Sequence, residues 1–88
     1  MSDYPLIYLE WDDAVTTPAS WFTVQETEAW IKDTNCLTKE CGWVIEETAE
    51  HIVFCSRQCA WQDGELQLGG LHKIPTTWIR KRVELTVV

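Results

Sequence analysis

The sequence predicts a mainly β protein, a small five-stranded and partly open barrel with one short helix inserted after the first strand. Short runs rich in β-branched and aromatic residues recur along the chain, and such residues suit a pleated, half-buried surface. Turn residues separate these runs, and bending a small sheet protects its edges. The 88 residues make a single domain, residues 1–88, with room for one small core.

The clearest local signal is a hairpin between Gly42 and Phe54. Two apolar runs, residues 43–45 and 52–54, flank the polar residues 46–50. Each run is too short and too β-branched for a buried helix, so we expect two antiparallel strands. Because the turn lacks Asn-Gly and Asp-Gly, it predicts a loop of three to five residues.

The first half of the chain predicts one strand and one helix. Residues 6–11 are typical of a strand, and Thr23 with Glu26 has the T-x-x-E spacing of a capping box that starts a helix over residues 24–32. The apolar stripe of this helix is weak, so we expect it to lie across a barrel mouth or edge. The stripe consists of Val24, Thr27 and Ile31, with Trp30 beside them.

The second half predicts two further strands. A turn at Asp63-Gly64 precedes a strand over residues 65–74, in which Gly69-Gly70 permits a sharp bend or a bulge. Residues 75–78 predict a single helical turn with Pro75 near its start. Residues 79–88 predict the closing strand.

The stretch GGLHKIPTTWIRKRVEL resembles the end of an SH3-like barrel, where a glycine and a proline precede a one-turn helix and a final strand. The whole chain also resembles small uncharacterised bacteriophage and mobile-element proteins. The residues that carry this likeness are Trp11-Asp12, residues 42–47, Ile74-Pro75 and Ile79. The resemblance implies a phage accessory role, such as interference with host machinery or defence, and brings no catalytic residues with it. Polyproline binding is not implied, because the first strand lacks the paired tyrosines of peptide-binding SH3 domains.

The net charge of −7 argues against unassisted binding to duplex nucleic acid. The charge is uneven, with net −9 over residues 1–50 and net +2 over residues 51–88. This pattern indicates either a solvated acidic face or a bipolar surface that meets a basic partner on one side and an anion on the other. The N-terminal stretch does not resemble a signal peptide, and no apolar run is long enough to span a membrane, so we expect a cytoplasmic protein with reduced thiols.

Four cysteines raise the question of a metal site. Cys41 with Cys55, and Cys36 with Cys59, lie symmetrically about the predicted hairpin turn, so four sulfurs could meet at its open end and bind zinc. Their spacings, C-x4-C and C-x3-C, differ from the usual C-x2-C knuckle, and free cysteine also packs as a small apolar residue. We therefore predict no metal ligands, and keep a zinc-stabilised structural or assembly component as an alternative.

The sequence does not predict an enzyme or a cofactor. His51 and His72 are the only imidazoles, and His51 lies four residues from Cys55, which is ~13 Å along a strand. That distance is too long for direct proton transfer to a nucleophile, although His72 could approach Cys55 or Cys59 across strands. Gly69-Gly70 lacks the helix and lysine of a phosphate loop.

Two hypotheses for function follow. The first is a non-enzymatic binding protein that docks on a host protein. The second is an oligomeric protein that sequesters a nucleotide-type anion, with arginine or lysine on the phosphates and tryptophan stacked on the base. The predicted binding residues are Arg57, Trp61, Lys73, Trp78, Arg80 and Arg82.

The closing strand bears on both hypotheses. Arg80 and Arg82 have the same parity, so a regular strand places them on one face, with Val83, Leu85 and Val87 on the inward side. The arginines either bind an anion or acidic partner, or guard an edge strand against pairing. An apolar closing strand can also pair with a second copy, which leaves a homo-oligomer open.

Overall fold

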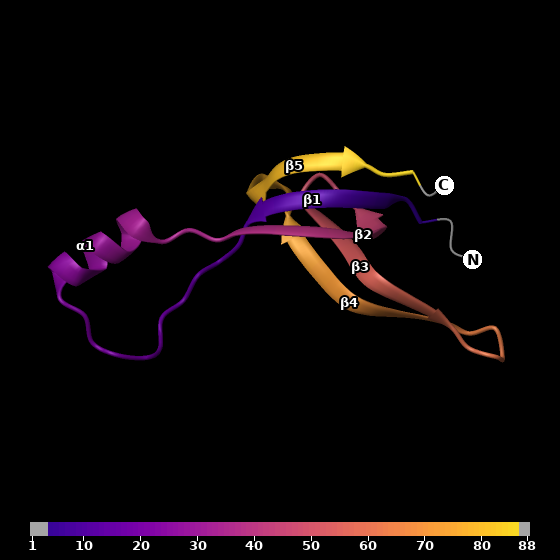
Figure 1. The fold of residues 1–88 in the computed structure, drawn as a ribbon, viewed down its shortest axis with the longest axis horizontal. Helices are drawn as coiled ribbons and strands as arrows, with labels where there is room; N and C mark the ends of the chain where they lie inside the picture. The colour runs from indigo at the N-terminus through magenta and orange to yellow at the C-terminus, as the bar shows by residue number, and fades with distance from the viewer. Residues whose placement is uncertain (1–3, 87–88) are drawn as a thin grey trace.

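A computed structural model describes residues 4–86 of the chain and shows one sheet with a projecting helix (Figure 1). The fold is mainly β, with five antiparallel strands and one short α-helix after the first strand, which confirms the predicted class. The elements in chain order are β1 (Leu6–Asp12), α1 (Val24–Asp33), β2 (Leu37–Glu47), β3 (His51–Ala60), β4 (Leu66–Pro75), the 3₁₀ turn η1 (Thr76–Trp78) and β5 (Ile79–Glu84).

The sheet has the strand order β4-β3-β2-β1-β5, so the last strand returns to pair with the first. The predicted single turn η1 carries the chain from one edge of the sheet to the other. The Thr76 N–H donates to the Glu50 carbonyl at 3.0 Å and its hydroxyl donates to the Ala49 carbonyl at 2.9 Å. This turn is thereby held on the β2–β3 loop. Within residues 4–86, β4 and β5 do not pair with each other, so the sheet curls but stays open.

The predicted hairpin is present, with a loop of three residues, Thr48 to Glu50, between β2 and β3. The Thr48 side chain closes this loop, since its hydroxyl oxygen accepts from the Glu50 and His51 N–H groups at 3.2 Å each. Both strands extend beyond the apolar runs that predicted them. The register with β3 shifts between Val44 and Glu46, which makes Ile45 a bulge.

The core lies on the concave side of the curled sheet. Alternate residues of β1 are fully or almost fully buried, as the period of a half-buried strand requires. The Trp11 ring meets the Phe54 ring edge-on, with centroids 5.8 Å apart. The buried cluster consists of Ile7, Leu9, Trp11, Val44, Ile52, Phe54 and Ile74.

The predicted inward side of the closing strand is wrong. Leu9 pairs with Arg82, so Arg82 shares the concave face with a buried residue, whereas Val83 pairs with Tyr8 on the opposite face and is 37% exposed. Leu85 follows the end of β5 and is also exposed, and Val87 lies outside the described residues.

A bulge in β5 explains part of this error. Glu10 pairs with Lys81 and Trp11 with Ile79, which leaves Arg80 as an extra residue in β5. Because a bulge shifts the alternation of side chains by one residue, parity along β5 does not predict a shared face for Arg80 and Arg82.

The predicted start of α1 is confirmed, but its predicted position is wrong. The helix begins after Thr23, and both hydrogen bonds of the capping box are present. None of its residues, all of which the structure describes, is buried, and Figure 1 shows it extending away from the sheet. The apolar stripe is too small to hold the helix against the barrel, and Trp30 contributes to a depression beside Phe22 within the same segment.

The β3–β4 hairpin bends as its glycines predict. Gly64 closes the predicted turn with φ of 85°, and the Asp63 carboxylate accepts from the Glu65 N–H at 2.9 Å. Gly70 has φ of 64°, which only glycine adopts without strain. The register with β3 stays continuous across this point, so Gly69-Gly70 allows a bend and not a bulge.

Candidate functional site

The six predicted binding residues do not form one site. Arg57 of β3 and Lys73 of β4 lie on the convex face of the hairpin, about four residues apart in register. Trp61 follows β3 at the hairpin end, and Trp78 belongs to η1. Arg80 and Arg82 lie on β5 at the other edge of the sheet. Trp78, Arg80 and Arg82 follow one another closely in sequence, whereas Arg57 and Trp61 belong to the β3–β4 hairpin.

Both arginines of β5 are held in ion pairs. Arg80 pairs with Asp12 of β1, and Arg82 pairs with Glu47 and with Glu84, the latter at 3.0 Å. The hydrogen bond with Glu47 raises the pKa of the Arg82 guanidinium, a direction that keeps it charged. These ion pairs connect β5 to β1 and β2. A ligand would have to compete with these carboxylates for the two guanidinium groups.

Arg57 differs from the β5 arginines, because no ion pair involves its guanidinium within residues 4–86. Its side chain lies across Gly69, where an added Cβ would be 3.5 Å from the Arg57 Nε. It borders a shallow depression of about 460 Å³ on the convex face of β3 and β4. We call this surface the hairpin face; it is lined by Trp43, Arg57, Gln58, Cys59, Gln67, Leu68 and Gly69.

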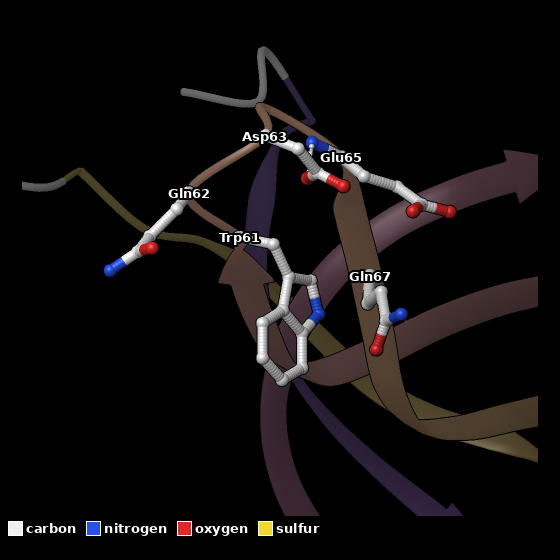
Figure 2. Close-up of a pocket in the computed structure, with 5 residues that line it drawn as sticks. All are labelled: Trp61, Gln62, Asp63, Glu65 and Gln67. Atoms are coloured by element: carbon white, nitrogen blue, oxygen red, sulfur yellow. Dashed lines mark hydrogen bonds between the residues drawn. The ribbon is translucent and has the colours of Figure 1, made fainter.

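A second depression of about 530 Å³ adjoins the hairpin face at Gln67. Figure 2 shows the Trp61 indole beside Gln67, with the carboxylates of Asp63 and Glu65 farther along the loop. Trp61 is 54% exposed, as its polar neighbours predict. The two carboxylates make this end of the hairpin unfavourable for a phosphate and leave Arg57 as the cation of the site.

The four cysteines do not gather. Cys55 is buried, whereas Cys36, Cys41 and Cys59 are exposed. Cys55 pairs with Trp43 and Cys41 pairs with Tyr8, and Cys36 precedes β2. In the part of the chain that the structure describes, no three His, Cys, Asp or Glu side chains are placed to hold a metal ion. The symmetric spacing of the cysteines assumes that Cys41 pairs with Cys55. In the actual hairpin register, Trp43 pairs with Cys55 instead.

Each histidine has a carboxylate neighbour, and among residues 4–86 no hydrogen bond joins either ring to a cysteine. The His51 Nε2 is 2.9 Å from a Glu46 oxygen, and the His72 Nε2 is 3.5 Å from a Glu40 oxygen. The His72 ring stacks on Phe54 with centroids 5.1 Å apart, on the concave side of the sheet. Cys55 lies on the opposite face, because adjacent residues of a strand point to opposite sides. Cys59 shares the parity of Cys55, so the expected approach of His72 to either thiol is absent.

The structure shows a second surface that the sequence reasoning missed. The segment between β1 and β2, residues 13–36, projects from the sheet with α1 at its end, and we call it the arm (Figure 1). Trp21 is 99% exposed, Val24 76% and Ile31 65%. Val24 and Ile31 are seven residues apart, so they lie on one helical face two turns from each other. The available signal was the strongly capped helix with too small an apolar stripe to pack on a core.

The arm is locally ordered although it is not packed on the sheet. The Asp13 N–H donates to the Cys36 carbonyl at 2.8 Å, which closes the base of the arm. At the helix start, the Glu26 N–H donates to the Thr23 hydroxyl oxygen at 3.0 Å and the Thr23 N–H donates to Glu26 at 3.2 Å. These bonds with Thr23 lower the pKa of the Glu26 carboxyl. These bonds favour the helical conformation at the start of α1.

The arm is also acidic. Residues 13–36 hold four acidic residues and Lys32 as the only basic one, a net charge of −3. Glu28 lies four residues after Val24 and three residues before Ile31, so it borders the exposed apolar strip. No ion pair involves Glu28 within the described residues.

Comparison with known proteins does not assign a family, since no protein-family model, curated protein or solved structure matches the chain. Among residues 4–86, no helix has the length and apolar character that crossing a membrane requires. The assignment of function therefore depends on the two surfaces described above.

Proposed function

We propose that this chain is a non-enzymatic binding protein that docks on a partner protein through the arm. One observation supports the proposal most strongly: a capped helix of ten residues projects from the sheet with no residue buried. Val24 and Ile31 are exposed on this helix, and Trp21 is exposed just before it. Residues 4–86 do not cover this apolar helix face, and such a face is typical of a helix that binds in a groove of another protein.

The energetics favour binding through this segment. Burying an exposed aliphatic side chain in a groove contributes about 1.5–3 kcal/mol, and an exposed tryptophan offers a larger apolar area. The capping box and the closed base favour the helical arm, which reduces the conformational entropy lost on association. The resemblance to bacteriophage proteins makes a host protein the expected partner, met in the cytoplasm.

A matched pair of variants tests the proposal. The tagged full chain and the double variant Trp21→Ala/Ile31→Ala are used to capture proteins from a bacterial host lysate, with Trp61→Ala as the control. All three side chains are exposed, so we expect unchanged melting temperatures. The arm variant should lose at least about tenfold of the captured partner, and Trp61→Ala should retain it. A partner that is captured equally by all three proteins would contradict docking through the arm.

The hairpin face favours a second candidate function, the sequestration of a nucleotide-type anion. The observation that favours it is the Arg57 guanidinium, which has no ion-pair partner within residues 4–86 and lies between Trp43 and the Trp61 end of the hairpin. In this reading Arg57 meets a phosphate and Trp61 stacks on a base.

Thermal melting against a panel of nucleotides separates the two candidates. A ligand present at about 100 times its Kd stabilises the native state by about 2.7 kcal/mol, which corresponds to ~10–20 °C for a domain of this size. The second function predicts such a shift for the wild type and its loss in Arg57→Ala. A flat panel would leave docking through the arm as the proposed function.

A further inference from the structure

The apolar strip of the arm has a charged border on one side. Val24 and Ile31 are about 10.5 Å apart along the helix axis, a spacing that two successive anchors in a groove require. Glu28 lies between them in sequence and next to both on the helix surface. Any wall that contacts both anchors must therefore also approach the Glu28 carboxylate.

That carboxylate is available for an intermolecular contact. Within residues 4–86, Glu28 has no ion-pair partner, whereas Glu26 is engaged by Thr23 in the capping box. The arm as a whole is net −3. When a groove removes water from Glu28, an apolar or acidic wall would leave the charge without compensation, and a basic wall would compensate it.

We infer that the arm binds a protein whose apolar groove is bordered by lysine or arginine side chains. This inference depends on the proposed docking function. The groove receives Val24 and Ile31, and the basic border meets Glu28. The acidic arm also accelerates the encounter with such a surface, because opposite charges steer association.

A second copy of this chain is a poorer occupant. The whole chain is net −7, so two copies repel each other. The β5 arginines are already paired with carboxylates of their own sheet. The depression that adjoins the hairpin face is lined by Asp63 and Glu65, which oppose an acidic arm.

The test combines charge variants with cross-linking. Proteins captured from a bacterial lysate by the tagged full chain are compared with those captured by Glu28→Gln and Glu28→Lys, at about 50 mM and about 500 mM salt. Glu65→Lys makes the same charge reversal on the hairpin and serves as the control. A carbodiimide, which joins a carboxylate directly to a neighbouring lysine amine, is then applied to each complex, and the joined peptides are identified by mass spectrometry.

The inference predicts that capture of the partner falls about tenfold in Glu28→Lys at low salt, falls less in Glu28→Gln, and is unchanged in Glu65→Lys. It also predicts cross-links between Glu28 and lysines that border an apolar groove of the partner. The double variant Trp21→Ala/Ile31→Ala is used for capture in parallel. Capture that falls in this double variant but is equal in all Glu28 variants would overturn the inference and leave the docking function standing. Cross-links from Glu28 to a second copy alone would overturn it as well. If the double variant captures every protein as well as the wild type does, the docking function itself fails.

Discussion

Replacing Gly42 with alanine should destabilise the sheet, because the added methyl group has no room on the concave face. A Cβ at this position would lie 2.3 Å from the Phe54 Cδ2 and 2.6 Å from the Cys55 carbonyl oxygen. The Phe54 ring cannot move aside freely, since it is fully buried between Trp11 and His72. Overpacking of this kind costs about 1–3 kcal/mol, and 2 kcal/mol corresponds to a fall in Tm of ~8–16 °C.

Gly69→Ala is the matched control in the same sheet. An added Cβ there would meet the flexible Arg57 side chain at an ordinary contact distance of 3.5 Å. The substitution restricts the unfolded chain, so we expect a stability change between zero and a gain of about 1 kcal/mol. Urea unfolding followed by tryptophan fluorescence measures both variants. A Gly42→Ala protein as stable as the wild type, or two variants destabilised equally, would refute the packing argument.

Three further predictions concern separate parts of the molecule. Thr23→Ala should weaken α1 by about 1 kcal/mol and speed hydrogen exchange in the arm, while the sheet amides keep their protection. Faster exchange of the sheet amides in Thr23→Ala than in the wild type would contradict an independent arm. The hydrogen bond to Glu10, together with burial, raises the pKa of Tyr8 to about 12. The neutral phenol is thus favoured in the fold, so its contribution to stability is full below pH 10 and is lost as pH rises through about 12. An ultraviolet titration should show this ionisation in the wild type and not in Tyr8→Phe. A wild type that lacks the ionisation would disprove the assignment. Phe54→Ala should cost about 3–5 kcal/mol in urea unfolding, and a loss under 1 kcal/mol would show that the core does not depend on this ring.

The sequence predicted the local elements because their signals are local. Residues 43–45 and 52–54 are β-branched and aromatic, and both lie in strands of the predicted hairpin. The T-x-x-E spacing at Thr23 and the Asp63-Gly64 pair each satisfy backbone groups only a few residues away. The partly open arrangement of five strands followed from the number of short strands around one small core.

The candidate sites were predicted less well, because they depend on register and on what each surface covers. Of the six predicted binding residues, Trp61 and Arg57 lie on the β3–β4 hairpin, and Trp61 is exposed. Arg80 and Arg82 were expected to share a face, but Arg80 is the extra residue of a bulge in β5. Each arginine forms an ion pair with a carboxylate of the same sheet. No sequence pattern predicts that bulge, because the extra residue exists only relative to the pairing of β5 with β1.

The position of the arm could not be predicted from the sequence either. Its sequence determined a capped helix, but a weak apolar stripe is equally compatible with packing on the barrel and with projection from it. The structure decided for projection, because the concave face of the sheet is already filled by Trp11, Phe54 and their neighbours.

By itself, the sequence determined where this chain forms strands, turns and a helix, through hydrogen bonds and side-chain preferences that act over a few residues. Only the tertiary structure decided which side chains are free to bind. The folded sheet joins each β5 arginine to a carboxylate and leaves Arg57 without a counter-ion within residues 4–86. It also leaves Val24, Glu28 and Ile31 exposed on the arm. The physical reason is that ion pairing and burial depend on contacts between strands distant in sequence, and these contacts exist only once the sheet has formed its register.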